Sequence, residues 1–469
     1  MDANDVLTLG LGVTPPWKLV GQRLDMTRQP NELHLEIEAD RGTLFPCPVC
    51  SRACKAHDFA EFTWRHLNFF QHHCSIIAKL PRSDCPEHGV LRINVPWARE
   101  GSRFTLLFEQ VAITLVREMP VLAAARIIGI TDQRLWRIVE HYVGKAVERL
   151  DLTRGKAIGL DETAAKRGQT YVTVFIDLDR KHKPVVFVTP GRGKETVARF
   201  NTFLAEHGGS PNHIVEVVCD RSGAFLAAVG ETFEDAVVTV DWFHVVQMFT
   251  KAVDEVRRTE AKHSKLPKAL RWAILKRADG RLTKAQAEAL AELEASDLLT
   301  AVAWRIKEML RWIRKADSVQ AARWRITHFL RHARARLAED RILDPMRKAL
   351  NSVDNHLRRI LQRWTSSHSN ARLEGLNGLF QAARARARGY RNTTTFATMI
   401  YLIAAPWETS SNPLETSKNP QIEGKDDWRR PNVAGERLDW NRRRDTCICV
   451  SLDQSLSSHD RLLISGSSW

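Results

Sequence analysis

The sequence lacks any long hydrophobic run. No apolar stretch approaches the roughly 20 residues that a helix needs to span a bilayer. The first residues, Met1 to Asp5, also lack the basic start and apolar run of a secretory signal peptide. We therefore expect a cytoplasmic protein. The chain has 469 residues and is 43% hydrophobic, which excludes a disordered protein and predicts roughly two to four domains with a buried core.

Acidic residues are too few to balance the basic ones. Lys and Arg total 70, against 55 for Asp and Glu, which gives a formal net charge of +15. A surplus of this size favours a polyanionic partner, most often nucleic acid. A soluble basic protein without such a partner could have the same net charge. The assignment of a nucleic-acid partner therefore depends on the motifs.

Cysteine is scarce outside one early segment. Five of the eight cysteines lie between residues 47 and 85. In a reducing cytosol this clustering indicates metal binding rather than disulfides. Two Cys-x-x-Cys/His pairs on tight turns predict a structural, tetrahedral zinc site with four ligands: Cys47, Cys50, Cys85 and His88. Alternative ligands remain open, namely Cys54, Cys74, His72 and His73.

The segment after the cysteines has helical periodicity. Residues 104–117 and 121–128 predict two helices, and Gly129 begins a turn in which Thr131 caps a third helix. The third helix is expected to bury Leu135, Ile138, Val139 and Tyr142. It is expected to expose Gln133, Arg134 and Arg137 near its N-terminus. This pattern predicts a helix-turn-helix that docks in the major groove of DNA, although a plain helical hairpin shares it.

From Lys156 onward, strand-like periodicity replaces the helical one. Three runs rich in β-branched and aromatic residues cover Ala157–Leu160, Tyr171–Ile176 and Val185–Val188. A helix near residues 195–206, a strand ending at Asp220, a short helix and a strand over 236–240 follow. This order predicts a ribonuclease H-like α/β fold. Asp161 would lie at the end of the first strand and Asp220 at the end of the fourth.

One later helix carries a polar stripe. Asn370, Glu374, Asn377 and Gln381 recur at helical spacing, and Leu373, Leu376 and Phe380 take the opposite side. Two strand-end aspartates and one helix glutamate have the composition of a two-metal magnesium site. We therefore expect Asp161, Asp220 and Glu374 to converge. Glu162, Asp177 and Asp179 compete for the ligand role if the register of the sheet differs.

The remaining segments differ sharply in composition. Residues 246–366 contain no strand pattern and predict an all-α insertion between Asp220 and Glu374. A basic segment after the striped helix is expected to hold a DNA backbone, through Arg384, Arg386, Arg388 and Arg391. A helical pattern resumes over residues 395–403. Residues 406–469 have no clear period and predict a disordered tail.

Two sets of short motifs lie along the chain. The N-terminal motifs are Cys47-Pro48-Val49-Cys50, Trp64-Arg65-His66-Leu67, the run from Pro81 to Val90, and Val95-Pro96-Trp97-Ala98. The C-terminal motifs are Gly159-Leu160-Asp161-Glu162, Asp241-Trp242-Phe243-His244-Val245-Val246, Asn370-x-x-x-Glu374-Gly375-x-Asn377 and Gly389-Tyr390-Arg391-Asn392. In combination and order, these motifs resemble the ISL3 family of bacterial insertion-sequence transposases over about residues 30–405.

The resemblance implies a DDE transposase that binds terminal inverted repeats and catalyses metal-dependent DNA cleavage and strand transfer. Asp161, Asp220 and Glu374 would be its triad and would hold Mg²⁺ or Mn²⁺. Asp241 and His244 resemble a signature that accompanies the triad in several such families. The implied partners are double-stranded DNA, both repeat and target, and further copies of the chain in a dimer or higher oligomer. Residues 406–469 do not resemble the family.

The predicted architecture is a multidomain α/β protein with six segments. They are a zinc ribbon (30–98), a helix-turn-helix domain (99–150), the first part of a ribonuclease H-like catalytic core (151–245), an all-α insertion (246–366), closing helices with Glu374 (367–405) and a tail (406–469).

Three other functions account for part of this pattern. A zinc-ribbon and helix-turn-helix regulator explains residues 40–150 and the charge, but not the carboxylates. A ribonuclease H-like nuclease explains the triad and makes the DNA-binding modules less necessary. An inactive transposase remnant would keep DNA binding alone. Metal-dependent cutting of DNA that contains an element end separates the enzymes from the regulator, and a strand-transfer product separates transposase from nuclease.

Overall fold

The computed structural model describes residues 7–406, except residues 9, 167, 169, 220–222, 276–281, 338 and 367. The contacts divide the chain into Met1–Ser417 and Lys418–Trp469, and only the first unit contains described residues. The predicted tail, apart from residue 406, lies outside the described residues. Within them, no helix is both long and apolar enough to cross a membrane.

The N-terminal part of the chain is a β-sheet with a small hairpin. The sheet has the order β1-β2-β6-β5, with β7 beside β6. Its strands are β1 (Trp17–Asp25), β2 (Glu32–Ala39), β5 (Ala56–Phe69), β6 (His72–Cys85) and β7 (Gly89–Arg92); the hairpin is β3 (Phe45–Pro46) with β4 (Ala53–Cys54). In β2, apolar and polar residues alternate from Leu33 to Glu38, as is typical of a half-buried strand. The sheet also includes β1, which precedes residue 30 and pairs antiparallel with β2.

Three helices follow, as the sequence predicts. They are α2 (Leu106–Glu118), α3 (Val121–Ile128) and α4 (Asp132–Glu148). Gly129 ends α3 with a φ of 72°, a left-handed conformation that glycine adopts without steric cost. The Thr131 side chain caps α4 by accepting a hydrogen bond from the Arg134 amide. The predicted helix–turn–helix geometry is therefore present.

A buried carboxylate joins these helices to the preceding loop. Glu109 on α2 is 0% exposed and pairs with Arg99 at 2.9 Å. Its oxygens also accept hydrogen bonds from the Ser102 and Tyr142 hydroxyls at 2.7 and 2.8 Å. Tyr142 was predicted to be buried but is only half-buried. Burial and the neighbouring Glu109 charge raise the pKa of Tyr142.

The central sheet has the order β10-β9-β8-β11-β12. Its strands are β8 (Ala157–Ala164), β9 (Tyr171–Asp177), β10 (Val185–Pro190), β11 (Glu216–Cys219) and β12 (Val237–Val240); the intervening helices are α5 (Lys194–Glu206) and α6 (Gly223–Thr232). β9 is antiparallel to β8 and β10, whereas β11 is parallel to β8 and β12. The predicted order of three strands, helix, strand, helix and strand is confirmed.

Alternation along β8 and β9 divides the core between the two faces of this sheet. Leu160 and Phe175 belong to the hydrophobic cluster that includes residues of α5 and α6. Val174 and Ile176 belong to a second cluster with helices α14 (Ala371–Arg386), α15 (Thr393–Ala404) and α2–α4. Because side chains alternate across a strand, Asp161 is on the α14 face, opposite Leu160.

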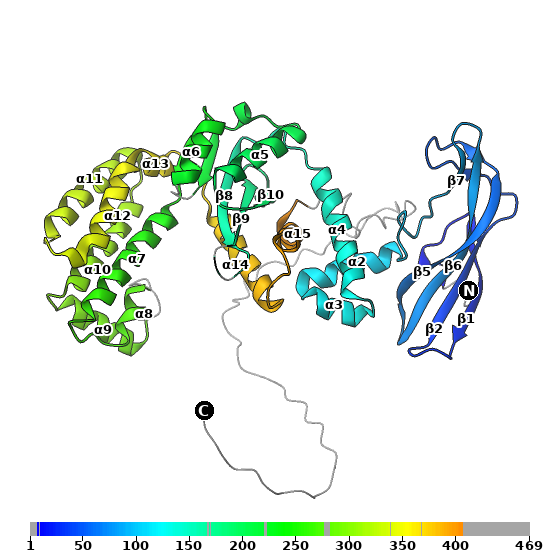
Figure 1. Ribbon diagram of the computed structural model, residues 1–469, viewed down its shortest axis with the longest axis horizontal. Coiled ribbons are helices and arrows are strands. Elements are labelled where there is room, and N and C mark those ends of the chain that lie inside the picture. The colour runs from blue at the N-terminus through cyan, green and yellow to red at the C-terminus, as the bar shows by residue number, and fades with distance from the viewer. Residues whose placement is uncertain are drawn as a thin grey trace, which may run out of the picture. The chain divides into compact units, whose positions relative to one another are not determined.

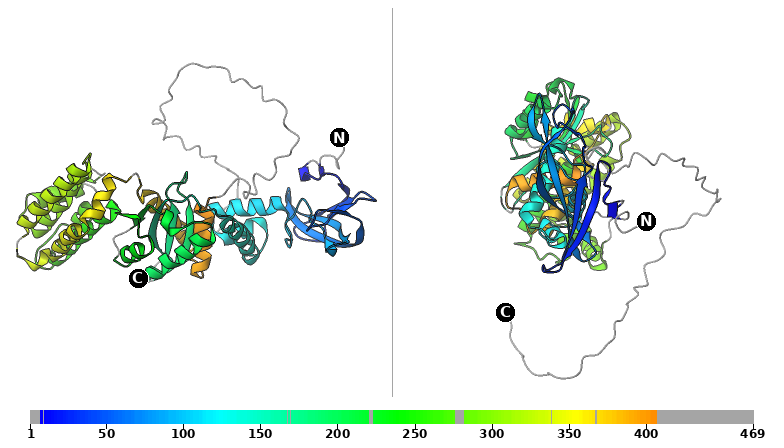
Figure 2. Two further views of the ribbon diagram at one scale, coloured as in Figure 1. Left: turned by 90° about the horizontal axis from the view of Figure 1, so that it is seen from above. Right: turned by 90° about the vertical axis from the view of Figure 1, so that its right-hand side faces the viewer.

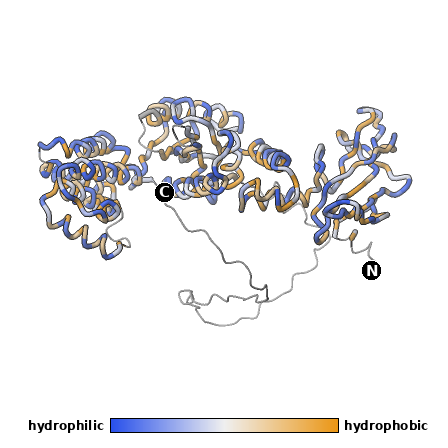
Figure 3. Tube along the Cα trace, turned by 60° about the horizontal axis from the view of Figure 1, so that its bottom comes forward, coloured by the Kyte–Doolittle hydropathy of each residue, from blue (hydrophilic) through white to orange (hydrophobic). Residues whose placement is uncertain are grey.

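Between β12 and α14, the only regular secondary structure of the described residues is helical. They are α7 (Trp242–Glu260), α8 (Leu270–Leu275), α9 (Lys284–Glu294), α10 (Leu299–Arg314), α11 (Val319–Arg336), α12 (Asp344–Asn355) and α13 (Leu357–Leu361), with 3₁₀ turns at Arg341–Leu343 and Gln362–Trp364. Their long members lie side by side as a bundle (Figures 1 and 2). Hydrophobic and hydrophilic positions alternate along them (Figure 3), as amphipathic packing requires. α7 begins at Trp242, before the predicted start at residue 246.

A buried glutamate fixes two helices of this bundle. Glu260, at the end of α7, is 6% exposed. Its carboxylate accepts hydrogen bonds from the Leu299 and Thr300 amides at the start of α10, each at 2.8 Å. The first amides of a helix have no partner within the helix, so the carboxylate satisfies them and the helix dipole favours its charge. α7 therefore holds the first turn of α10 in place.

Candidate functional site

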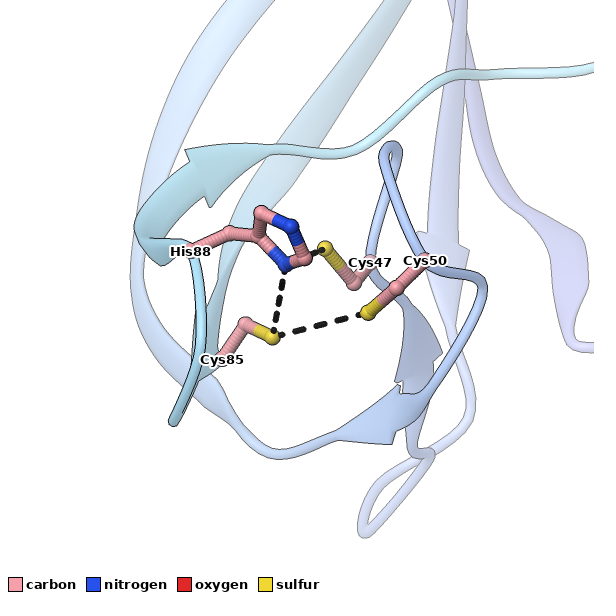
Figure 4. A group of neighbouring side chains, drawn as sticks. All are labelled: Cys47, Cys50, Cys85 and His88. Carbon is pink, nitrogen blue, oxygen red and sulfur yellow. Dashed lines mark hydrogen bonds between the residues drawn. The ribbon is translucent and has the colours of Figure 1, made fainter.

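Four predicted zinc ligands meet at one point in the N-terminal part. Cys47 and Cys50 lie on the β3–β4 turn, and Cys85 and His88 lie where β6 turns into β7 (Figure 4). All four ligand atoms lie within 4.8 Å of one another. The Cys50 and Cys85 sulfurs are 3.7 Å apart, and the Cys85 sulfur is 3.6 Å from His88 Nδ1.

These distances fit a tetrahedral zinc ion. A Zn–S bond of about 2.3 Å implies ligand atoms about 3.8 Å apart around a tetrahedron. The hydrogen bond to His88 is the largest of several effects that lower the pKa of Cys85 to about 6, which favours the thiolate that zinc binds. All four positions come from protein, which is the composition of a structural site.

Two of the alternative ligands have other roles. Cys54 is buried beside Cys47 and Cys85, and its thiol donates to the Arg52 carbonyl. Cys74 lies in the core of the N-terminal sheet, where burial raises its pKa to about 11. The four-residue cluster of the described chain includes neither of them, nor His72 or His73.

The second candidate site is built on β8. Asp161 is 9% exposed and lies in the middle of β8, opposite Val174 of β9. The prediction that it ends the first strand is wrong, because pairing of residues 162–164 with β9 extends the strand. Asn370 is fully buried and donates to the Leu160 carbonyl at 3.1 Å.

Close approach of α14 to β8 depends on a glycine. A Cβ atom on Gly159 would lie 2.5 Å from Asn370 Oδ1 and 2.9 Å from Ile176 Cγ1. Real Cβ contacts are essentially never shorter than 3.0 Å. Only glycine therefore allows the start of α14 to contact the strand at this position.

The polar stripe of α14 follows β8. Asn377 Nδ2 donates to Asp161 Oδ2 at 2.9 Å, and Gln381 Nε2 donates to Thr163 Oγ1 at 2.7 Å. The predicted apolar side, Leu373, Leu376 and Phe380, is at most 1% exposed. The stripe and the packing of the opposite side are thus confirmed. They bring Glu374 to the strand that carries Asp161.

Glu374 lies among like charges. Its pKa is raised to about 8, first by burial, then by the charge of Asp241 and a hydrogen bond with it, and then by Asp161. Asp241 is the N-cap of α7 and accepts a hydrogen bond from the Phe243 amide. His244, on the first turn of α7, places Nε2 4.0 Å from Asp161 Oδ1. Four of the five predicted catalytic residues therefore lie together: Asp161, Asp241, His244 and Glu374.

The fifth predicted catalytic residue, Asp220, lies outside the described residues. It follows Cys219, the last residue of β11, and β11 pairs with β8. Its predicted role as a ligand therefore stays a prediction from the sequence.

Two of the carboxylates that could compete for the metal-ligand role, Asp177 and Asp179, make their contacts away from Asp161. Asp177 pairs with Arg180 at 3.0 Å, and Asp179 accepts hydrogen bonds from the Lys156 and Ala157 amides. These contacts lie toward the start of β8, since Asp177 is opposite Ile158. Glu162 alternates with Asp161 along the strand, so its side chain leaves from the other face.

The carboxylate cluster suits a magnesium ion. Mg²⁺ prefers carboxylate and water oxygens. Asp241 Oδ2 and His244 Nε2 are buried and have no hydrogen-bond partner among the described residues. A carboxyl group whose pKa is raised by its like-charged neighbours gains most from a cation beside it. The residues present therefore fit the predicted metal.

The predicted DNA-binding residues fall into two groups. Gln133, Arg134 and Arg137 are all exposed on α4, as major-groove docking requires. In the basic segment, Arg384 and Arg386 donate to the carbonyls of Ala164 and Glu118. Arg388 and Arg391 are exposed. The first two arginines thus also fasten α14 to its neighbours.

The sequence reading missed a basic cleft beside the carboxylates. Asp241 and Glu374 line a cavity of about 600 Å³ together with Lys307, Arg311 and Arg314 of α10. Lys315 and Arg363 line it as well. The signal was present, because residues 307, 311 and 314 recur at helical spacing. Nothing in that spacing indicates that α10 lies beside α7 and α14.

Three regions of the chain match known families. Residues 158–400 match the DDE domain of ISL3 transposases, described as "Transposase". Residues 93–143 match the helix-turn-helix domain of transposase family ISL3. Residues 43–88 match the zinc-finger of transposase IS204/IS1001/IS1096/IS1165.

Individual transposases that match the chain share only a minority of its residues. The chain is 27% identical over 298 residues to the transposase for insertion sequence element IS1557 of Mycobacterium tuberculosis, covering 57% of this chain and 66% of that relative. It is 24% identical over 362 residues to the transposase for IS1001 of Bordetella parapertussis, covering 75% and 86%. The chain thus spans just under two thirds of the mycobacterial relatives.

Among solved structures, the chain is similar to the HTLV-2 integrase catalytic core domain in complex with magnesium, in its dimeric and trimeric forms. Each match is 16% identical, with a TM-score of 0.15. The dimeric form is matched over 31% of this chain and 89% of that one.

Proposed function

The chain belongs to the ISL3 family of transposases, and we propose that it binds the terminal inverted repeats of its insertion sequence and catalyses divalent-metal-dependent DNA cleavage and strand transfer there. The match of residues 158–400 covers half of the chain and includes Asp161, Asp220, Asp241, His244 and Glu374. The resemblance stated from the motifs is thereby confirmed at the level of the family.

One observation carries the proposal. Asp161 and the polar stripe of α14 are joined by a hydrogen bond between residues 216 positions apart in the sequence. That contact holds Glu374 in a partly buried position beside Asp241 and Asp161, where burial first and then the two neighbouring carboxyl groups raise its pKa to about 8. A fold that needed only a stable core would not gather three carboxyl groups, two of which, Asp241 and Glu374, line a cleft, because their repulsion opposes folding.

Asp161, Asp220 and Glu374 would hold magnesium or manganese ions, with Asp241 beside them. Bound ions of this kind lower the pKa of an attacking water or 3′-hydroxyl and stabilise the leaving oxygen in an in-line displacement at phosphorus. Asn377 orients Asp161 through its hydrogen bond, and Asn370 fixes the start of α14 on β8. The raised pKa of Glu374 disfavours its anion in the absence of a cation. His244 would donate from Nε2 to a phosphate oxygen.

DNA contacts would come from α4 and from the basic segment after α14. Gln133, Arg134 and Arg137 would read bases in the major groove, and the basic segment, Arg384 to Arg391, would contact the backbone near the site. A zinc ion held by Cys47, Cys50, Cys85 and His88 would join the β3–β4 turn to the β6–β7 turn. Its role would be structural.

We extend the proposal to the organisation of the chain. The sheet order β10-β9-β8-β11-β12, with β9 antiparallel, supports a ribonuclease H-like core at 151–245 and 367–405, interrupted by the all-α insertion 246–366. The zinc ribbon would cover 30–98 and the helix-turn-helix domain 99–150. A cytoplasmic dimer or higher oligomer would assemble on the two element ends, because strand transfer must join both.

Incubation with a DNA duplex that carries the element's terminal repeat and flanking DNA tests this function. With Mg²⁺ or Mn²⁺ we expect a cut at the repeat boundary and, when target DNA is added, a joined product. Omission of Mg²⁺ and Mn²⁺ should remove both products while leaving the DNA bound. Binding without cutting would favour the regulator or remnant, and cutting without joined product would favour a nuclease.

A further inference from the structure

The cavity beside the carboxylates has walls of opposite charge. Asp241 and Glu374 contribute acidic groups on one side, and α10 contributes Lys307, Arg311 and Arg314 on the other. Glu308 neutralises part of this basic wall, since it pairs with Lys307 at 3.1 Å and with Arg311 at 3.0 Å. Five basic groups against one glutamate leave the α10 side of the cavity positively charged.

Three cations of this wall have no carboxylate partner within the described residues. They are Arg314, Lys315 and Arg363. Favourable interaction with the helix dipole explains basic residues at the end of α10. It does not explain Arg363, which comes from the 3₁₀ turn Gln362–Trp364, or Lys307, which is 7% exposed and donates to the Ile274 carbonyl. Two separate segments thus direct positive charge into the same cavity.

Resting on the function proposed above, we propose that this cleft binds the DNA strand next to the scissile phosphate, so that α10 and Arg363 position the substrate at the carboxylates. Residues 307 to 314 span roughly 10 Å along a helix, which is the axial length of about three phosphates on one DNA strand. Phe243 also lines the cavity, is 48% exposed and offers an aromatic ring on which a base can stack. The insertion is then part of the active site.

A matched pair of double variants tests the cleft. The test variant is Arg314→Ala with Lys315→Ala. The control is Arg331→Ala with Arg336→Ala on α11, which removes the same charge from two exposed residues of the same insertion that do not line the cleft. None of these four residues has an ion pair within the described chain, so both variants should keep the wild-type thermal midpoint.

Cleavage of the end duplex should fall about tenfold or more in the test variant and stay within about twofold of wild type in the control. The slope of log binding constant against log salt should flatten by roughly one for each phosphate contact removed. Methylphosphonate groups, which remove single backbone charges beside the cleavage position, should slow the wild type. They should have no further effect on the test variant, because the two changes remove the same interaction.

Equal behaviour of the two double variants, whether both slow the reaction or neither does, would overturn the proposal. Failure of the wild type to cut the duplex would instead contradict the proposed function. The salt slope needs no cutting, so it still decides whether the cleft contacts DNA in that case.

Discussion

The Cys47–His88 cluster and the Asp161–Glu374 cluster both gather metal-binding groups, yet they do so under opposite electrostatic conditions. In the first, hydrogen bonds lower the pKa of Cys85 to about 6, so the ligand is prepared to lose its proton. In the second, burial and like charges raise the pKa of Glu374 to about 8, so the ligand keeps its proton until a cation arrives.

The two clusters also differ in construction. The thiol and imidazole ligands come from two tight turns close in sequence and fill all four positions of a tetrahedral site. The carboxyl groups come from a strand, a helix cap and a distant helix, and the latter two, Asp241 and Glu374, border a cavity. A metal site whose four positions are all filled by protein stabilises the local fold. Carboxyl groups beside a cavity are instead suited to bind a substrate together with its ions.

The strongest test of this difference removes one carboxylate. Asp161→Asn, Asp241→Asn or Glu374→Gln should each reduce cleavage of the end duplex roughly a thousandfold or more, equivalent to about 4 kcal/mol of transition-state stabilisation. Affinity for the duplex should be nearly unchanged, because α4 and the basic segment are untouched. Single-turnover cleavage and equilibrium binding on the same duplex measure both. Wild-type cleavage by any one variant would exclude that residue as an essential ligand.

Zinc removal should act on the other cluster. Cys85→Ser should abolish zinc content, since structural zinc sites contribute apparent binding energies of about 10–16 kcal/mol in small domains. Proteolysis should then cut within residues 45–92, and end-specific binding should weaken. Cys54→Ser is the matched control, because Cys54 is buried beside the cluster but bonds to the Arg52 carbonyl. Retention of zinc by Cys85→Ser, or its loss from Cys54→Ser, would contradict the assignment.

DNA recognition should depend on the exposed face of α4. Arg134→Ala and Arg137→Ala should each weaken binding to the terminal repeat by about 1–3 kcal/mol and reduce discrimination against scrambled DNA. Arg126→Ala, on the exposed face of α3, serves as control. Competition binding with repeat and scrambled duplexes distinguishes the cases; unchanged discrimination in both α4 variants would remove α4 from base reading.

Two glycines test how α14 is held on β8. Gly159→Ala should destabilise the protein by about 1–3 kcal/mol and slow cleavage, because the new Cβ overlaps Asn370 and Ile176. Gly375→Ala, whose Cβ would meet nothing within 4 Å, should leave stability unchanged or raise it by up to about 1 kcal/mol. Chemical denaturation measures both; equal effects would mean that α14 does not approach the strand so closely.

The smallest expected effect is a pH dependence of thermal stability in the absence of Mg²⁺ and Mn²⁺. The folded-state pKa of Glu374, about 8, lies above its ordinary value of 4.5. The folded state then holds a proton that the unfolded state loses, so this group's contribution to stability declines as pH rises from 4.5 to 8. In buffer without Mg²⁺ or Mn²⁺, Glu374→Gln should therefore gain thermal stability relative to wild type across that range. If the thermal midpoints of Glu374→Gln and wild type instead change with pH in parallel, the pKa of Glu374 is not raised.

Local periodicity predicted much of the carboxylate site. The stripe of α14 and its buried opposite side follow from spacing alone, and the capped turn at Thr131 follows from residue preferences. The extent of β8 did not follow from local periodicity, because residues 162–164 become strand only through pairing with β9. The basic cleft also escaped prediction, since it depends on tertiary packing of α10 beside α7. The sequence predicted that the striped helix would approach Asp161, but not that α10 would lie beside that helix.

The late position of α14 in the chain has a consequence during protein synthesis. The helix-turn-helix and β8 are complete long before the ribosome reaches Glu374, which follows the entire helical insertion. Domains generally fold as they are synthesised. Any product that stops within the insertion would therefore carry the recognition helix without the third carboxylate. Under the function proposed above, such a fragment would occupy element ends without cutting them, and would compete with the full-length chain.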